Sequence, residues 1–416
     1  MTVLKLKSLR LSQEKLFMGS ALLVNGGNYL YNVLVGRILG PEAFAEAALL
    51  VTLLLVISFL GMTFQLATTK FAVLLNGQQW QALRSKISMY ALWIGIGLGC
   101  VVALFARNLQ AWFSTASPWM FVLFGLGIPL YFLMSIKRGE YQGNNALDKL
   151  SISYQAEMWS RLIITILLLM LIPYSPGLLV SAGILISFAF GFLPYENGNR
   201  IRSVKITLSS ENKRNLNHFL LLTAGYELTQ ILINNFDVIL VKHYFDAYQA
   251  GLYASMALIG RVVYFVAWMF AMLLLPKVIR QQKKGEPTAP VLFRYVILIA
   301  LLAVTIVGLC LFFPEQIVTV MFGPAYMPIA GMLWQYALAT ALFAISNIFA
   351  YYYLSLDQYL PVIVSALVGL LQLVLIVFFH DTLEGVVQIQ IGSMFCLLLL
   401  QVAYYYLNRD RKILKA

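Results

Sequence analysis

Long apolar runs alternate with short charged breaks along the whole chain. The runs have the length of about 20 residues that a helix needs to cross a bilayer core roughly 30 Å thick. Membrane-spanning strands are shorter and alternate apolar with polar residues, which these runs do not do. The pattern therefore predicts an all-α integral membrane protein with about twelve transmembrane helices. The predicted spans are residues 16–36, 44–66, 87–106, 119–136, 152–172, 177–195, 219–241, 252–275, 291–313, 328–354, 360–379 and 383–407.

Composition supports a membrane as the main solvent. Of the 416 residues, 61% are hydrophobic and 11% are charged, whereas about a quarter of the residues of a soluble domain are charged. No break between spans is long enough to hold a soluble catalytic domain, and the longest, residues 196–217, is polar and basic.

The distribution of Lys and Arg predicts the orientation of the chain. Of the 29 basic residues, 24 fall in the two termini and in alternate breaks, all on one side of the predicted membrane. Cytoplasmic loops are enriched in Lys and Arg, so both termini are predicted to be cytoplasmic. The net charge of +12 then reflects topology and contact with anionic headgroups, and it gives no reason to expect a nucleic-acid partner.

The second half of the chain resembles the first. A shift of 206 residues superimposes Gly19, Leu22, Asn28, Leu34, Val35 and Ala48 on Gly225, Leu228, Asn234, Leu240, Val241 and Ala254. Since each half has six predicted spans, both halves start on the same side, as in parallel repeats. We therefore expect two six-helix bundles, residues 1–200 and 201–416.

Polar stripes mark the first span of each half. Residues three or four apart share one helical face, and each stripe follows that spacing. The stripes are Asn25, Asn28 and Asn32 in span one, and Glu227, Gln230, Asn234 and Asp237 in span seven. They are predicted to face each other across a central aqueous cavity, with an interhelical hydrogen-bond seam as the alternative. Two carboxylic acids favour the cavity, because ionisable groups in a span usually serve function.

Three basic residues within or beside spans are candidate anchors for a phosphate or pyrophosphate group. A guanidinium suits this role because it binds such anions with two hydrogen bonds. Arg261 has no acid at helical spacing within its span, whereas Arg161 follows Glu157 by four residues and has a structural alternative as its ion-pair partner. Lys70, at the cytoplasmic end of span two, has the alternative of extending to the headgroups.

No catalytic or metal-binding pattern accompanies these residues. The three cysteines and three histidines are scattered, without the spacing of disulfides or metal ligands. A phosphate-binding loop of the GxxxxGK[ST] type and a defensible nucleophile and base arrangement are both missing from the sequence. We therefore expect a non-enzymatic protein without cofactors or metals, whose work is driven by gradients, membrane potential or substrate flux.

Four short segments resemble, in order along both halves, polysaccharide-biosynthesis flippases. They are GRILGPEAF (36–44), RGEYQG (138–143) followed by Glu157 and Arg161, GLY (251–253) and FGPAY (322–326). These segments are similar to those of Wzx-type transporters of lipid-linked oligosaccharides, in the MOP exporter superfamily with its MATE-like fold. Ala45 departs from that pattern, which usually has glycine there, while Gly251 keeps the glycine in the second repeat.

The resemblance implies two bundles around a V-shaped cavity that opens alternately to each side of a bacterial inner membrane. The implied substrate is an undecaprenyl-pyrophosphate-linked sugar unit, such as an O-antigen or other surface polysaccharide unit, moved to the outer leaflet. Arg261, with Lys70 and Arg161, would attract the pyrophosphate. Sugar hydroxyls would bind Asn25, Asn28, Asn32, Gln230 and Asn234, and a coupling proton or Na⁺ would bind Glu227 and Asp237.

Other functions fit parts of the same pattern. A cation-coupled multidrug antiporter of the same superfamily would need an acidic cavity, whereas this one mixes acids with arginine. A membrane-embedded glycosyltransferase or polymerase would need catalytic acids and larger outward loops. A scaffold that partners other glycan-assembly proteins remains a further alternative. Besides the lipid-linked glycan, membrane lipids are expected partners.

Overall fold

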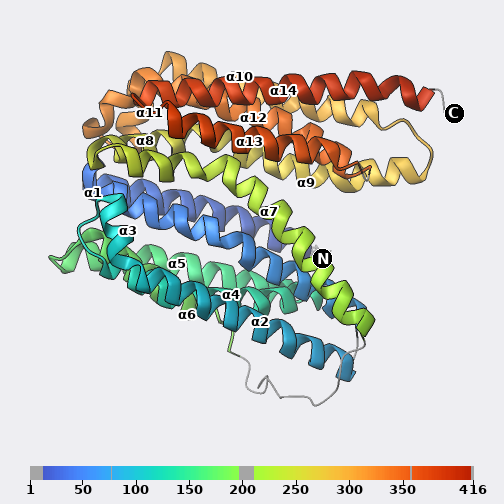
Figure 1. Cartoon of the computed structure of the whole chain (residues 1–416), viewed down its shortest axis with the longest axis horizontal. Coiled ribbons are helices and arrows are strands. Elements are labelled where there is room, and N and C mark those ends of the chain that lie inside the picture. The colour runs from blue at the N-terminus through green and yellow to red at the C-terminus, as the bar shows by residue number, and fades with distance from the viewer. Residues whose placement is uncertain (1–12, 76, 196–209, 357, 414–416) are drawn as a thin grey trace, which may run out of the picture. The chain divides into compact units, whose positions relative to one another are not determined.

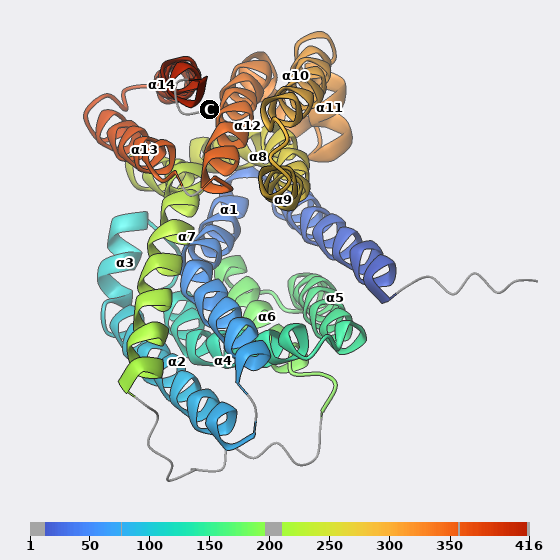
Figure 2. The same ribbon diagram turned by 90° about the vertical axis from the view of Figure 1, so that its right-hand side faces the viewer.

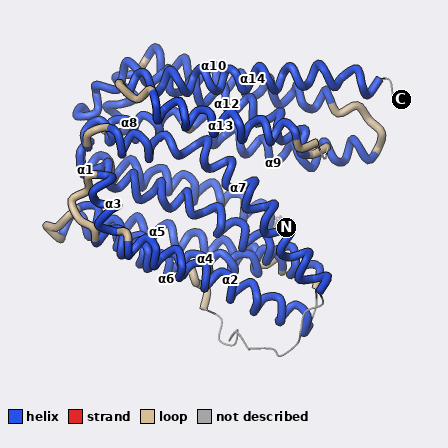
Figure 3. Tube along the Cα trace, in the orientation of Figure 1, coloured by secondary structure: helices blue, strands red, loops and turns tan. Residues whose placement is uncertain are grey.

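The computed structural model describes residues 13–75, 77–195, 210–356 and 358–413. Within these ranges the chain forms helices joined by turns, and no strand occurs (Figure 3). In chain order the helices are α1 (Gln13–Leu74), α2 (Gly77–Leu104), α3 (Ala106–Phe113), α4 (Trp119–Gly143), α5 (Leu147–Leu171), α6 (Pro176–Phe190), α7 (Ser210–Tyr244), α8 (Ala247–Gly260), α9 (Val262–Lys283), α10 (Ala289–Phe312), α11 (Pro314–Met321), the 3₁₀ helix η1 (Pro324–Met332), α12 (Leu333–Leu354), α13 (Leu360–Phe378) and α14 (Leu383–Ile413).

All the predicted spans fall on helical segments, with two changes of boundary. Spans one and two lie in α1, which reverses direction at Gly40 (φ 72°, ψ 172°), directly before Pro41 (Figure 2). A positive φ is accessible to glycine at little cost. Span eight is interrupted, because α8 ends at Gly260 and α9 begins at Val262, which leaves Arg261 at the break.

Hydropathy measured on the helices agrees with the membrane prediction. Among the described residues, eight helical segments are long and apolar enough to cross a bilayer, one of them holding both arms of α1. The shorter α6 is a further apolar helix of 15 residues. The prediction of an all-α integral membrane protein is confirmed, and the cytoplasmic placement of the termini stays a prediction.

The chain groups into two compact units that are not contiguous in sequence. Unit 1 takes Met1–Asn32 and Ile57–Glu227, and unit 2 takes Val33–Val56 and Leu228–Ala416. The chain therefore passes from one unit to the other inside α1, twice, and inside α7 (Figure 1). The predicted division into 1–200 and 201–416 stays a prediction, since residues 196–209 lie outside the described ranges.

Helix α4 is the centre of unit 1. It packs against α2, α5 and α6 and fully buries Met120, Phe121 and Phe132. The α2 and α4 backbones approach closely, because a Cβ on Gly125 would lie 2.7 Å from the carbonyl oxygen of Gly99. Small residues allow such approach, which provides the packing that holds helices together in lipid.

Helix α12 has the same place in unit 2, where it packs against α8, α9, α10, α13 and α14. The order of elements around the two central helices is also the same. A short amphipathic helix follows a long one in each unit, since α3 begins at residue 106 and α11 at residue 314, a separation of 208 residues. This order agrees with the predicted repeat of 206 residues.

Three of the four family-like segments meet in unit 2 and form what we call the motif joint, residues 36–44, 251–253 and 322–326. The Tyr326 hydroxyl donates a hydrogen bond of 2.7 Å to the Gly36 carbonyl oxygen. The rings of Phe44 and Phe322 lie 5.8 Å apart, and the Phe322 and Tyr326 rings 5.1 Å apart. A Cβ on Gly251 would overlap the carbonyl oxygen of Pro41. These motifs therefore fix the outer turn of α1 to unit 2.

Candidate functional site

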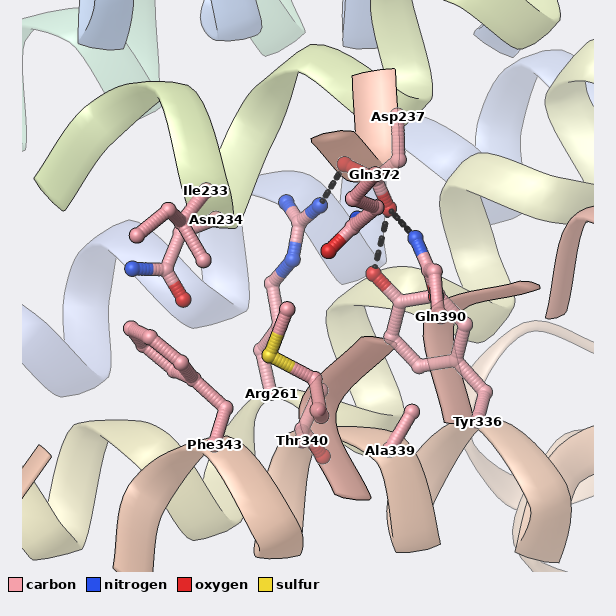
Figure 4. Close-up of a pocket in the computed structure, with 11 residues that line it drawn as sticks. Ile233, Asn234, Asp237, Arg261, Tyr336, Ala339, Thr340, Phe343, Gln372 and Gln390 are labelled. Carbon is pink, nitrogen blue, oxygen red and sulfur yellow. Dashed lines mark hydrogen bonds and ion pairs between the residues drawn. The ribbon is translucent and has the colours of Figure 1, made fainter. Parts of the chain in front are cut away.

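A buried carboxylate in unit 2 collects four donors from three other parts of the chain. Asp237 on α7 accepts hydrogen bonds from Arg261 Nη2 at 2.7 Å and from the Tyr336 hydroxyl at 2.7 Å. It also accepts from Gln390 Nε2 at 2.9 Å and from the Tyr253 hydroxyl at 3.1 Å. Asp237 is 1% exposed and Arg261 8%. We call these five residues the Asp237 cluster (Figure 4).

The helix break at Arg261 explains how the guanidinium reaches its partner. Residue 261 is the C-cap of α8, where the backbone turns before α9 begins. From there Nη1 also donates to the Asn235 side-chain oxygen at 3.3 Å. An ionised carboxylate offers about four lone-pair positions. With four donors around it, Asp237 has all of them occupied and is held as the counter-ion of Arg261.

A small cavity adjoins this ion pair. Its volume is about 20 Å³, which is room for one water molecule. The polar residues that line it include Asn234, Arg261, Thr340 and Gln372 (Figure 4). Gln372 is 2% exposed, and its Oε1 atom accepts no hydrogen bond from any described residue. The arrangement suits a small polar molecule that donates to Gln372 beside the guanidinium.

A second buried cluster lies in unit 1, where one glutamate serves two arginines. Glu157 on α5 accepts from Arg138 Nη2 at 2.7 Å and from Arg161 Nη1 at 3.1 Å. Arg138 also donates to the Ser153 hydroxyl at 2.9 Å, and Arg161 donates to the side-chain oxygen of Asn28 on α1. We call this set the Glu157 cluster. Two guanidinium groups and one carboxylate give it a net positive charge.

The RGEYQG segment is therefore structural as well as charged. Orientation counting treats Arg138 as a residue of a cytoplasmic break, and that placement is wrong, because α4 continues to Gly143 and Arg138 is 4% exposed. Glu140, in the same turn, pairs with Arg84 of α2. Gln142 accepts a hydrogen bond of 3.1 Å from Gln65, which also contacts Tyr154. The segment ties α4 to α1, α2 and α5.

Removal of Arg161 is expected to cost less stability than removal of Arg138. After Arg161→Gln, Glu157 keeps Arg138 as its partner, so the loss is that of one hydrogen bond to a charged group, about 1–3 kcal/mol. Arg138→Gln removes bonds to both Glu157 and Ser153 and should lower the unfolding midpoint further. Denaturant unfolding of the two variants in detergent measures the difference. Equal midpoints would contradict the assignment of Arg138 as the main partner.

The polar stripe of α1 is partly engaged within unit 1. The Asn28 side chain accepts from Arg161, and Asn32 donates back to the Asn28 carbonyl oxygen at 2.9 Å. Asn25 is exposed. Lys70 is exposed too, and its ammonium lies 4.2 Å from the centre of the Phe219 ring, which is a cation–π contact.

The stripe of α7 is divided between the units. Glu227 is half-buried in unit 1, while Asn234 and Asp237 belong to unit 2. The side chain of Gln230 lies outside the described residues. The facing of the two stripes across a central cavity stays a prediction.

Sequence reasoning missed the acid beside Arg261. Asp237 is 24 residues away, on another helix, and helical spacing within one span could not detect it. Tyr336 and Gln390 carried no signal either, whereas Tyr253 lies in the GLY segment and was within reach of the motif. As for metals, the described residues hold no group of three or more His, Cys, Asp or Glu side chains that could bind one.

Comparison with known proteins places this geometry in a family. The model of a family described as "Polysaccharide biosynthesis protein" matches residues 34–331, more than half of the chain. No curated protein sequence matches.

Solved structures of transporters have the same fold. An inward-facing multidrug resistance MATE transporter of the MOP superfamily has a TM-score of 0.77 at 11% identity, over 92% of this chain and 94% of its own. The lipid II flippase MurJ, in an inward closed conformation, also has a TM-score of 0.77, at 14% identity, over 94% of this chain and 87% of its own. A MOP superfamily transporter from Pyrococcus furiosus, whose binding pocket is described as reversed in polarity, has a TM-score of 0.62 at 12% identity, over 94% of this chain and 92% of its own. Similarity at these identities shows the MOP fold of two six-helix bundles.

Proposed function

Because the chain belongs to the family of polysaccharide biosynthesis proteins, we propose that it is a flippase for an undecaprenyl-pyrophosphate-linked oligosaccharide. It moves an O-antigen or other surface polysaccharide unit from the cytoplasmic to the outer leaflet of a bacterial inner membrane by alternating access. The fold supports a transporter, since the similar structures are those of MATE transporters and a lipid II flippase. Other glycan-assembly proteins are partners in this proposal.

The observation that carries the proposal is the guanidinium of Arg261, held at a helix break beside a cavity in unit 2. A pyrophosphate offers Arg261 the same paired oxygen acceptors as Asp237 does. The substrate therefore competes with Asp237 for Arg261, and Tyr336, Tyr253 and Gln390 keep the carboxylate solvated by hydrogen bonds while the arginine is away.

The remaining candidate residues have supporting roles. Lys70 is an exposed cation that attracts the pyrophosphate at the start of the path, and Arg161 acts mainly by holding the Asn28 amide. Asn25, Asn28, Asn32, Gln230 and Asn234 bind sugar hydroxyls. Membrane potential assists, because outward movement of an anion from a negative interior gains about 2.3 kcal/mol per charge per 100 mV.

Glu227 is the better candidate for binding a coupling proton or Na⁺. Asp237 has four donors, so a cation that bound it would have to displace at least one of them. Glu227→Gln is therefore expected to leave transport indifferent to the pH or Na⁺ gradient, while the folded state persists. Flipping measured in liposomes with and without an imposed gradient tests this. A gradient response that survives in Glu227→Gln would move the coupling site elsewhere.

A cation-coupled drug antiporter is the second candidate, because the MATE transporter has the same TM-score as the flippase. The paired Arg261 at the cavity of unit 2 makes that site unfavourable for a cationic drug, and resistance to cationic dyes on overexpression would favour the antiporter. Deletion of the gene tests the flippase directly. We expect the lipid-linked glycan to accumulate in the cytoplasmic leaflet, and unchanged export of the glycan would contradict the proposal.

A further inference from the structure

An apolar groove of about 420 Å³ lies on unit 1, between the first arm of α1 and α5. Trp159 of α5 forms one wall, and the α1 residues that line the groove are Gly19, Leu22, Leu23, Gly26, Gly27 and Leu30. Gly19 and Gly26 leave notches in this surface, since a Cβ on either would meet no atom within 4 Å.

The groove and the polar stripe lie on opposite sides of the same helix. Gly26 and Asn28 are two residues apart, which is about 200° around an α-helix. The side of Asn28 is turned toward the Glu157 cluster through Arg161. On α5, Trp159 precedes Arg161 by two residues, so the groove and the net positive cluster are at the same height, separated by about 3 Å along the helix axis.

Contacts with α5 close one edge of α1 and leave the other open. Gln155 donates to Ser20 at 3.0 Å, and a Cβ on Gly27 would lie 2.6 Å from Cε of Met158. On the other edge Met18, Leu22 and Asn25 are exposed. The surface of α1 therefore changes from apolar to amide without a neighbouring helix of unit 1 in between.

From this arrangement we propose that the groove holds the polyisoprenyl chain of an anionic lipid carrier while its charged head lies on the opposite side of α1. The inference rests on the proposed function and adds the place of the tail to it. The charge of the Glu157 cluster complements a pyrophosphate at the same height, and the linkage between head and tail passes the open edge at Asn25. Branched methyl groups fill the notches at Gly19 and Gly26, while an ordinary acyl chain has no branches to place there.

Photo-crosslinking of the full chain in nanodiscs tests the groove. The probe is a polyprenyl pyrophosphate with a diazirine near the middle of its isoprenoid chain. We expect labelling of residues 19–30 and of Trp159, with at least a tenfold reduction in Gly26→Trp, which fills the groove. The matched control is Gly97→Trp on α2, since Gly97 is also exposed with open space around it, and it should label like the wild type.

The source of the ligand is settled by competition. Unlabelled polyprenyl pyrophosphate should abolish the labelling, and a tenfold excess of phosphatidylglycerol should not. If phosphatidylglycerol competes equally, or if Gly26→Trp labels like Gly97→Trp, the groove is an ordinary lipid surface and the inference is overturned. Because labelling requires no transport, a labelled protein without flipping activity would contradict only the proposed function, and a flippase without groove labelling would contradict only the inference.

Discussion

Asp237→Ala is expected to destabilise the protein by about 3–5 kcal/mol, the cost of leaving a buried charge without its partner. Arg261 would keep a full charge in a site where it is 8% exposed, and three further donors would lose their acceptor. Thermal or denaturant unfolding in detergent should show a large drop in the midpoint, or little folded protein on gel filtration.

A second substitution separates the ion pair from a general packing defect. Asp237→Ala combined with Arg261→Met removes both charges and should recover a large part of the lost stability, because contacting residues are not additive. The control is Glu315→Ala, an exposed acid on α11, whose loss should change the midpoint by less than about 0.5 kcal/mol. If the double variant were as unstable as Asp237→Ala, the pairing of these residues would not be the source of the loss.

Gly251→Val is expected to prevent the motif joint from forming. Its Cβ would overlap the backbone of Pro41, and α1 cannot simply move aside, because Gly40 sets a fixed turn at φ 72° and Tyr326 holds Gly36. Overpacking costs about 1–3 kcal/mol and more where a backbone must shift. We expect a strong loss of folded protein, measured as the monodisperse fraction after extraction.

The matched control is Gly392→Val on α14. A Cβ at Gly392 meets no atom within 4 Å, so valine there should cost only the difference in helix propensity and leave the monodisperse fraction close to the wild type. Equal yields of the two variants would show that the close approach of Gly251 and Pro41 is not required.

Much of the fold could be predicted from the sequence because the bilayer limits the possible structures. Apolar runs of span length must be helices in lipid, and the repeat of 206 residues predicted the matching order of α3 and α11 in the two halves. What remained hidden was the assignment of chain to units. Residues 33–56 join unit 2 through contacts with residues more than 200 positions away, such as Tyr326, and no local pattern records such contacts.

The candidate site was predictable only in part for a similar reason. Helical spacing identified the pairing of Glu157 with Arg161, which lie one turn apart. It could not identify Arg138 as the second partner of Glu157, or Asp237 as the partner of Arg261, because each pair joins different helices. The sequence thus indicated which ionisable residues were unusual, and the tertiary structure decided which of them neutralise each other.

Reconstituted flipping gives the most direct test of the central claim that Arg261 anchors a lipid-linked oligosaccharide for transport. Purified protein in liposomes is given a polyprenyl-pyrophosphate-linked oligosaccharide, and arrival of the sugar in the opposite leaflet is followed with a lectin. The informative variant is Asp237→Asn with Arg261→Gln, which removes both charges and keeps hydrogen-bonding side chains in the cluster, so that folding is retained and can be checked by gel filtration. The account predicts rapid flipping by the wild type and at least a tenfold slower rate for the folded double variant. Wild-type flipping no faster than in protein-free liposomes, or an unchanged rate in the double variant, would contradict it.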